Sequence, residues 1–349
     1  MGCASARLAD SVTAVQTVAV LSLGGTISMS SPGDDGGPVV PALGSAELVR
    51  AVPGLAATGV ELVTVDVRRL PGAGLTMAVL DEAVRLAGEH VDAGAAGVVV
   101  TQGTDTIEET SFALDLRWDR DEPLIVTGAM RHAGQAGADG PANLLAAVAT
   151  AASPAARGLG CVVVMADEIH AARWVRKTHT TGVTAFGSPA AGPLGELVEG
   201  RPLVHLRPPR LPTTPQPVLD GIRIALVTAV LDDDGIFLPA LAGRADGLVV
   251  AALGAGHVPV AWVEPLTDLV TQLPVVLASR IGAGPVLTRT YGYPGSEADL
   301  IDRGLVPAGA LDPFKARVLL HRLLAGGTKP DDVRDAFARF TTPVATSTP

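Results

Sequence analysis

A run of three valines that leads into a polar turn constrains the fold of this chain more than any other feature. It lies in Gly97–Thr110, GVVVTQGTDTIEET. Uninterrupted β-branched residues are typical of a strand buried on both faces, as in a parallel sheet. Thr104, Asp105 and Thr106 are favoured N-cap residues, and glutamates follow the last two at capping-box spacing. The stretch predicts a strand, a turn and a capped helix, and ligands bind at such turns in open α/β sheets.

A second stretch near the start of the chain has the same organisation. Thr17–Leu23, TVAVLSL, predicts a buried strand, and Gly24, Gly25 and Thr26 follow it. Two successive glycines allow a tight turn and a close approach of the backbone to a ligand. Parallel strands end at the same edge of their sheet. If the two strands are neighbours, Thr26 and Thr104 therefore face one crevice.

Strand and helix patterns alternate along the rest of the chain, which is typical of an α/β protein. Its 349 residues exceed what one ordinary core needs and suit two domains. We expect a larger N-terminal domain, with a mostly parallel sheet and helices on both faces, and a smaller C-terminal α/β domain. The expected parts are an N-terminal tail at 1–16, the N-terminal catalytic domain at 17–200, a proline-rich linker at 201–218, the C-terminal domain at 219–341 and a tail at 342–349.

The composition excludes several classes of partner. The net charge of -10 argues against electrostatic binding of nucleic acid. The long uncharged run Gly247–Val263 contains glycines, a proline and His257, so it predicts a buried strand and a loop and no membrane span. The histidines lack the spacing of metal ligands, and no G-x-G-x-x-G pattern follows the first strand. We therefore expect neither a metal nor another cofactor.

Two features predict a cytoplasmic location. The chain has two cysteines, Cys3 in the expected tail and Cys161, so it carries no disulfide framework. Residues 1–16 lack the apolar segment of a signal peptide. Both features suit a reducing compartment.

The two threonines need a base before they can do covalent chemistry, because a neutral hydroxyl is a poor nucleophile. A lysine that is paired with Asp105 and partly desolvated can take the proton. Lysines are few, and Lys177 lies beyond the fifth predicted strand, at its crevice end. Its segment, 167–181, is rich in charge and is also compatible with an ordinary solvent-exposed hairpin. The residues alone leave the identity of the base open.

Several blocks stand in one order along the chain: SLGGTIS, TQGTDTIEET, VTGAMR, ADGPANL, RWVRKTHTT, AFGSPAAGPLG and ALDPFKARVLL. In order and spacing they resemble the bacterial L-asparaginase/glutaminase family of two-domain amidohydrolases. The resemblance covers about residues 17–340. Two signature blocks with supporting blocks are far more specific than a single motif.

The resemblance implies roles for four residues of the N-terminal domain. Thr26 matches the threonine that becomes acylated in the family. Thr104 and Asp105 match the pair of the second block, and Lys177 matches the lysine that hydrogen-bonds to that pair. Asp105 would also hold the α-ammonium group of the substrate. The resemblance further implies a homotetramer of two intimate dimers, in which the partner's C-terminal domain completes each site, and no cofactor.

The chain departs from the family pattern at substrate-binding positions. The flexible first loop of the family carries a tyrosine, and Gly37 or Pro38 stands in its place here. The serine and the polar residue that bind the α-carboxylate are replaced by Gly72 and Ala73. Without the serine we expect weak binding of L-asparagine, unless backbone N–H groups of these two residues take over.

Two C-terminal positions bear on the same question. The asparagine that reaches across from the neighbouring subunit in the family corresponds to His257. The two tyrosines of the chain, Tyr291 and Tyr293, stand near the position of an acidic residue that enters the neighbour's site. We expect Tyr291 to supply the missing hydroxyl across the dimer. The alternative is a tyrosine that only lines an interface.

The sequence thus predicts an amidohydrolase of asparagine catabolism, which converts L-asparagine to L-aspartate and ammonia through an acyl-enzyme at Thr26. One alternative keeps this chemistry for glutamine, a D-amino-acid amide or another small amide. A second is a non-catalytic amino-acid-binding protein on the same fold, although a binder has no use for a nucleophile and its base. A third is a subunit of a tRNA-dependent amidotransferase. Such subunits normally carry an extra N-terminal domain, for which the expected tail leaves no room.

Overall fold

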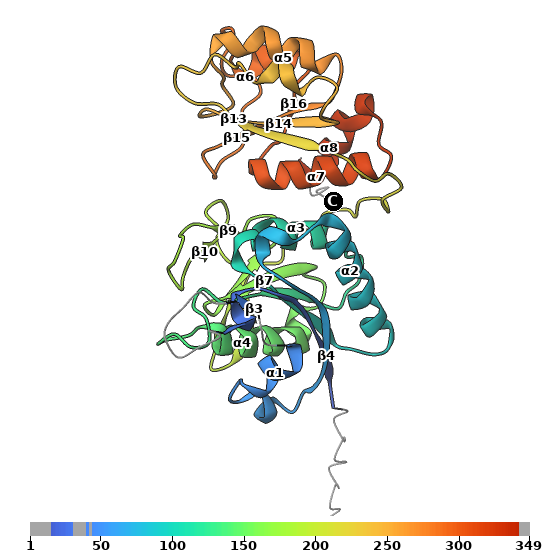
Figure 1. Cartoon of the computed structure of the whole chain (residues 1–349), viewed down its shortest axis with the longest axis vertical. Helices are drawn as coiled ribbons and strands as arrows, with labels where there is room; N and C mark the ends of the chain where they lie inside the picture. The colour runs from blue at the N-terminus through green and yellow to red at the C-terminus, as the bar shows by residue number, and fades with distance from the viewer. Residues whose placement is uncertain (1–14, 31–39, 42–43, 342–349) are drawn as a thin grey trace, which may run out of the picture.

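Two α/β domains are stacked along the long axis of the computed structural model, which describes residues 15–30, 40–41 and 44–341 (Figure 1). The N-terminal domain contains the larger sheet, and the C-terminal domain, yellow to red in Figure 1, contains the smaller one. This is the two-domain α/β fold that the sequence predicts. Gly37 and Pro38 lie outside the described residues, as do residues 1–14 and 342–349 of the two expected tails.

The described part of the N-terminal domain forms an eight-stranded sheet. From edge to edge its strands are β12 (Arg201–Val204), β11 (Gly195–Val198), β8 (Glu168–Ala171), β7 (Cys161–Met165), β6 (Leu124–Thr127), β5 (Gly97–Thr101), β1 (Thr17–Gly24) and β4 (Glu61–Leu70). The strands from β7 to β4 run parallel, and the pairings from β7 to β12 are antiparallel. The sheet is therefore mostly parallel, as predicted.

Helices cover both faces of this sheet. They are α1 (Ser45–Arg50), α2 (Met77–Asp92), α3 (Ile107–Asp115) and α4 (Gly140–Ala152). Successive residues of a strand point to opposite faces. In β1, Ala19 and Leu21 therefore join the apolar core that includes residues of α2 and α3, while Val18 and Val20 join the core that includes residues of α1 and α4.

The C-terminal domain repeats this plan on a smaller scale. Its strands are, in sheet order, β13 (Ile224–Thr228), β14 (Gly247–Ala252), β15 (Val275–Ser279) and β16 (Val306–Pro307), and all pairings are parallel. Its helices are α5 (Val263–Val270), α6 (Glu297–Asp302), α7 (Pro313–Ala325) and α8 (Val333–Thr341). Residues of α5 and α6 share one apolar cluster with β14 and β15, and residues of α7 and α8 share the other. Helix α7 faces the N-terminal domain and packs against α3 (Figure 1).

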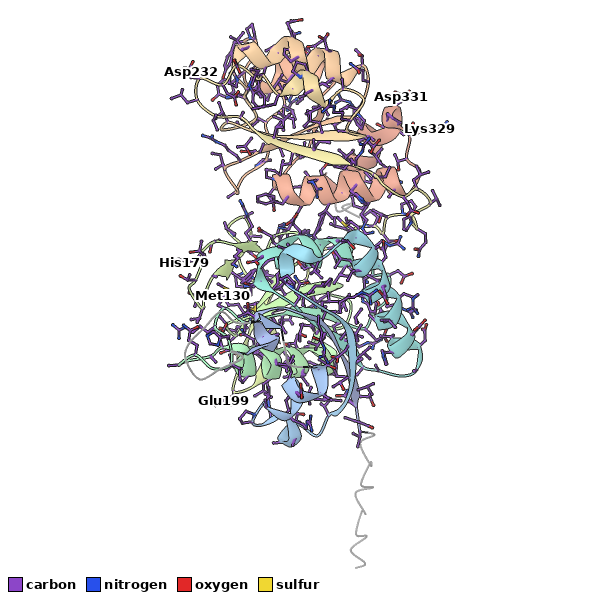
Figure 2. The ribbon with its side chains drawn as sticks, viewed as in Figure 1. Met130, His179, Glu199, Asp232, Lys329 and Asp331 are labelled. Carbon is purple, nitrogen blue, oxygen red and sulfur yellow. The ribbon has the colours of Figure 1, made fainter. Side chains whose placement is uncertain are left out.

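Short antiparallel pairs complete the described structure. They are β2 (Met29–Ser30) with β3 (Val40–Pro41), and β9 (Arg176–Lys177) with β10 (Phe186–Gly187). The charged segment 167–181 is thus not one hairpin, because β8 pairs with β7 and β9 pairs with β10. His179, just beyond β9, lies at the outer surface of the N-terminal domain (Figure 2).

The segment expected to be a linker begins with a strand. Residues 201–204 form β12 and pair with β11, so the sheet continues four residues into the segment 201–218. Proline tends to hide such a strand in a sequence, but β12 is the edge of the sheet, where Pro202 needs no N–H for a further neighbour. Farther along, Thr214 N donates to Leu116 O at 2.7 Å and Arg117 Nη1 donates to Pro215 O at 2.6 Å. This part of the segment is therefore bound to the N-terminal domain.

Candidate active site

Thr26 and Thr104 follow the carboxyl ends of adjacent parallel strands. β1 and β5 are hydrogen-bonded neighbours in the middle of the parallel part of the sheet. Each strand is followed by a short 3₁₀ turn, η1 (Thr26–Ser28) after β1 and η4 (Thr104–Thr106) after β5. The two strands that the sequence predicts for one crevice are thus neighbours.

Three turns meet at this edge of the sheet through backbone contacts that leave no room for side chains. Gly25 has a φ of +86°, and a Cβ atom there would lie 1.9 Å from the backbone nitrogen of Gly103. A Cβ atom on Gly103 would lie 2.8 Å from the nitrogen of Gly72, which begins the third turn, η3 (Gly72–Gly74). Only glycine tolerates both the positive φ and the contact at position 25. This glycine therefore fixes how closely the turns after β1 and β5 approach.

Lys177 reaches these turns from β9 and joins Thr104 to Asp105. Its Nζ atom donates a hydrogen bond to Thr104 Oγ1 at 2.9 Å and lies 3.3 Å from Asp105 Oδ1. Thr104 is 5% exposed and the lysine side chain 16% exposed, so little water competes for their contact. The structure thus brings the predicted lysine to the predicted pair and away from bulk solvent.

Asp105 has a different environment, because its side chain is 66% exposed. Its ion pair with Lys177 therefore adds little to stability. An accessible carboxylate can also bind a cationic group that arrives from solution. The three side chains combine a sheltered hydroxyl, an amine and an open carboxylate, which suits proton transfer beside a bound ammonium group.

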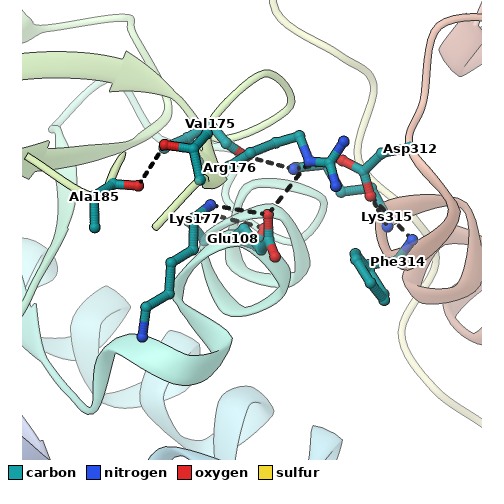
Figure 3. A network of polar contacts seen from close by, with 10 residues as sticks. Glu108, Val175, Arg176, Lys177, Ala185, Asp312, Phe314 and Lys315 are labelled. Carbon is teal, nitrogen blue, oxygen red and sulfur yellow. Dashed lines mark hydrogen bonds and ion pairs between the residues drawn. The ribbon is translucent and has the colours of Figure 1, made fainter. Parts of the chain in front are cut away.

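The helix after this turn does not begin with the predicted capping box. Thr106 is the N-cap of α3, but its side chain makes no capping hydrogen bond. Its hydroxyl donates instead to Gly72 O at 3.3 Å, which ties η4 to η3. Glu108 Oε2 accepts the backbone N–H of Lys177 at 3.2 Å (Figure 3). Both partners are distant in the chain, so a local pattern cannot reveal these contacts.

Gly72 and Ala73, which the resemblance places at the α-carboxylate site, lie beside the turn of Asp105. Gly72 is buried and Ala73 is exposed. A Cβ atom on Gly72 would lie 3.2 Å from Gly103 O and 3.4 Å from Asp105 Cβ. The backbone of η3 therefore packs directly against the turn that holds Asp105.

A second polar group, the His257 cluster, lies in the C-terminal domain and comprises His257, Tyr291, Tyr293 and Glu297. His257 follows the carboxyl end of β14, and its Nε2 atom lies 3.1 Å from Oε2 of the fully buried Glu297. The hydroxyl of Tyr293 lies 3.1 Å from His257 Nδ1. The ring of Tyr291 stands at 88° to the imidazole, with 5.0 Å between centroids.

The charge of Glu297 sets the direction of its hydrogen bond with His257. Burial raises the pKa of Glu297, but hydrogen bonds from the N–H groups of Tyr291 and Thr290 and from His257 outweigh it, so the pKa lies below its usual value. An ionised Glu297 accepts a hydrogen bond from His257 Nε2, which leaves Nδ1 facing the hydroxyl of Tyr293. The oriented hydroxyl thus belongs to Tyr293, while Tyr291, the residue singled out from the sequence, contributes its ring.

The His257 cluster is separate from the turns after β1 and β5 within one chain. Among the described residues, no hydrogen bond or ion pair joins the two groups. Tyr291 is 44% exposed and Tyr293 is 50% exposed. The cluster therefore presents two partly open aromatic side chains on a rigid, buried carboxylate.

Family models match both domains of this chain. The model described as "Asparaginase, N-terminal" matches residues 17–210, and the one described as "Glutaminase/Asparaginase C-terminal domain" matches residues 223–337. The chain belongs to the asparaginase family. It is similar to the probable L-asparaginase of Deinococcus radiodurans, at 39% identity over 92% of this chain and 97% of that protein.

Other asparaginases agree with this assignment. L-asparaginase 2 of Escherichia coli is 36% identical over 70% of each chain. The crystal structure titled as a probable cytoplasmic L-asparaginase from Campylobacter jejuni superposes with a TM-score of 0.79 at 30% identity. It covers 92% of this chain and 99% of that one. Family, fold and the two-domain arrangement therefore agree.

Two negative findings apply to the described part of this asparaginase-family chain. None of its described helices has both the length and the apolar composition that crossing a bilayer requires. Its described residues contain no group of three or more His, Cys, Asp or Glu side chains placed to hold a metal ion.

Proposed function

We propose that this protein hydrolyses the side-chain amide of L-asparagine to L-aspartate and ammonia, with Thr26 as the nucleophile. The observation that carries the proposal is the contact of Lys177 Nζ with both Thr104 Oγ1 and Asp105 Oδ1, next to the turn of Thr26. A non-catalytic binder gains nothing from a lysine directed at a sheltered hydroxyl. Family membership adds independent support.

The proposed reaction has two halves. In the first, Thr26 Oγ attacks the amide carbon, its proton moves through Thr104 toward Lys177, and the amide nitrogen takes up a proton and leaves as ammonia. In the second, water attacks the resulting ester and aspartate leaves Thr26. Backbone N–H groups near Thr26 and Thr104 stabilise the oxyanion of each tetrahedral intermediate.

The proposed substrate site uses Asp105 for the α-ammonium group and the backbone of Gly72 and Ala73 for the α-carboxylate. The exposure of Asp105 and its position beside η3 support this assignment. A side-chain hydrogen bond to a charged group contributes roughly 1.5–3 kcal/mol, or about ten- to a hundredfold in affinity. Since no side chain of η3 supplies one, we expect a raised KM for L-asparagine.

We further propose that the site is shared between subunits of a homotetramer, built as a dimer of dimers. His257, Tyr291 and Tyr293 would then face the substrate of a second copy, because their own chain offers them no contact with Thr104 or Lys177 among the described residues. Light scattering at micromolar concentration tests this part. An active monomer would contradict it.

We propose the cytoplasm as the compartment of this protein. The sulfur of Cys161 is buried and unpaired in the structure, which suits a reducing environment. The Campylobacter jejuni protein of similar structure is itself titled as cytoplasmic. Fractionation of the source cells checks the proposal, and recovery of the protein outside the cytoplasm would contradict it.

The experiment that tests the function is a panel assay of ammonia release from L-asparagine, D-asparagine, L-glutamine and dipeptide amides. We expect the highest kcat/KM for L-asparagine and a KM well above the low micromolar range. A preference for another amide would support the proposed chemistry but show that L-asparagine is not the main substrate. Absence of ammonia release from every amide, with ligand binding retained, would favour a binding protein.

A further inference from the structure

A buried lysine of the C-terminal domain holds the segment that carries Lys177. Lys315 lies in the first turn of α7, and its side chain is 0% exposed. Its Nζ atom donates to Val175 O at 2.6 Å and to Asp312 Oδ2 at 2.8 Å (Figure 3). Val175 stands immediately before β9 and two residues before Lys177. One ammonium group thus links α7 to the backbone of the lysine segment.

Asp312 fixes this ammonium group relative to its own helix. It is the N-cap of α7, and its Oδ1 atom accepts the N–H groups of Phe314 at 3.0 Å and Lys315 at 3.1 Å. Its other oxygen holds Lys315 Nζ. A carboxylate bonded on both sides has little freedom, so the position of the ammonium group follows the end of α7.

The opposite side of β9 is held by the N-terminal domain. Glu108 Oε2 accepts the N–H of Lys177 at 3.2 Å and lies 3.8 Å from Arg176 Nε (Figure 3). On the next residue, Thr178 N donates to Ala185 O at 2.6 Å, beside β10. The backbone around Lys177 is therefore held by α3, by the strand pair and by α7.

The charges around this segment are arranged in pairs. Burial raises the pKa of Glu108, and the nearby ammonium group of Lys315 acts against that rise. Two carboxylates, Glu108 and Asp312, lie among two cations, Arg176 and Lys315. Buried ion pairs are often no more stabilising than apolar side chains of similar size. Overall stability is therefore a weak reason for a fully buried lysine here, and its contact with Val175 O points to positioning.

We infer that Lys315, anchored by Asp312, is a positioning residue that sets where Lys177 Nζ lies relative to Thr104 and Asp105. The inference rests on the proposed function, in which Lys177 relays the proton. It makes the geometry of the catalytic lysine depend on the contact of Lys315 in α7 with the backbone just before β9. A displacement of about 1 Å in a reacting group can cost about a hundredfold in rate.

The test compares two substitutions on the same helix of the full-length protein. Lys315→Met removes the donor to Val175 O. Arg322→Met is the matched control, because Arg322 is also buried on α7 and donates to both oxygens of Asp81 at 2.8 Å, but it does not touch β9. Both are assayed for kcat, KM, pH profile and unfolding, at a temperature where each is folded.

We expect Lys315→Met to lower kcat at least about tenfold, to shift the pH profile and to change KM much less. Arg322→Met should keep kcat within about twofold, and Lys315→Arg should recover part of the loss. Amide exchange at residues 175–178 should become faster in Lys315→Met only. Equal kcat losses in both Met variants, or no loss in Lys315→Met, would overturn the inference.

Two further variants test the inference if Lys315→Met does not fold and distinguish it from the proposed proton relay. If Lys315→Met does not fold, Asp312→Asn replaces it, because asparagine keeps the N-cap and weakens only the hold on the ammonium group. An unchanged kcat in Asp312→Asn would then overturn the inference. Lys177→Met, measured in parallel, separates the two claims. If it keeps the wild-type kcat, the proposed relay fails, and if it is inactive while Lys315→Met is not, only the positioning fails.

Discussion

Each domain carries a candidate functional turn at the carboxyl end of a parallel strand, and the two turns are held in different ways. After β5, Thr104 is almost buried, and its turn is packed against two other turns of the same domain. After β14, His257 is fixed by the buried Glu297, while the tyrosines beside it are about half exposed. The turn after β5 makes its packing contacts within its own domain, whereas the tyrosines beside the turn after β14 are exposed to solvent.

This difference separates two tasks. A proton relay needs fixed distances between sheltered groups, which the close glycine contacts of the N-terminal turn provide. Groups that recognise a substrate in another subunit, the role proposed for Tyr291 and Tyr293, must reach the surface, and both tyrosines are partly exposed. We therefore expect substitutions at the N-terminal turn to act mainly on kcat, and those in the His257 cluster to act more weakly and partly through KM.

The largest effects should come from the two threonines. Thr26→Ala and Thr104→Val should each lower kcat by about a thousandfold or more, because groups that act as a unit are each indispensable. The matched change in the other turn, His257→Asn, should stay within about tenfold. Ammonia release and melting temperature are measured for all three. More than a tenth of wild-type activity in Thr26→Ala would show that the nucleophile is another residue.

Lys177→Met should have the next largest effect. A general base contributes about 10² to 10⁴ in rate, so kcat should fall by that factor, the pH profile should change, and KM should change much less. The control is His179→Asn, which lies two residues away at the surface and should remain near wild type (Figure 2). Equal kcat values for the two variants would show that Lys177 has no catalytic role.

The N-terminal domain should also respond to acid through His170, which is fully buried. Burial lowers its pKa from 6.5 to about 4, so the folded state favours the neutral ring. This contribution to stability is present above pH 6.5 and is lost as the pH falls through about 4; it amounts to about 3 kcal/mol at most. Glu168 Oε2, 3.2 Å from Nε2, would pair with the protonated ring and reduce the loss.

Denaturant unfolding of wild type and His170→Asn at pH 7, 5 and 4 measures the contribution of His170 to the free energy of unfolding. The variant should gain stability relative to wild type as the pH falls. The comparison is needed because Asp115 acts in the opposite direction: burial raises its pKa to about 6, so its contribution is lost as the pH rises through 6. A constant difference between the two proteins across this range would refute the assignment to His170.

The smallest effect should separate the two tyrosines. Tyr293→Phe removes the hydroxyl bonded to His257 Nδ1 and should change kcat/KM by about two- to tenfold, the range of one hydrogen bond. Tyr291→Phe keeps the ring that meets the imidazole and should remain close to wild type. The reverse order would restore the sequence-based expectation that Tyr291 supplies the hydroxyl.

Sequence patterns predict the parts of the candidate site that are formed by residues adjacent in the chain. β-branched runs predicted β1 and β5, and the polar residues after them predicted the turns of Thr26 and Thr104. Lys177 needed the family resemblance, because its approach to Thr104 depends on the pairing of β9 with β10. Periodicity carries no information about such a contact, since 73 residues separate the partners.

Contacts between distant segments remained hidden for the same reason. Glu108 has capping-box spacing, yet its carboxylate accepts the backbone N–H of Lys177 at 3.2 Å. The folded chain places this N–H beside the carboxylate although 69 residues separate the two. Glu297 stands in an ordinary helix start, and nothing local marks it as the buried support of His257. β12 is hidden in the sequence because it contains Pro202, which an edge strand tolerates.

The path of the chain between the domains has a practical consequence. Up to Pro215 the segment is hydrogen-bonded to the N-terminal domain, and from Val218, whose N–H donates to Ala325 O at 2.7 Å, it belongs to the C-terminal domain. Only Gln216 and Pro217 lie between these two attachment points. The ion pair of Arg322 with Asp81 and the contact of Lys315 with Val175 join the domains directly. We therefore expect two polypeptides, encoded by a gene divided at this point, to associate through these contacts without a peptide bond between them.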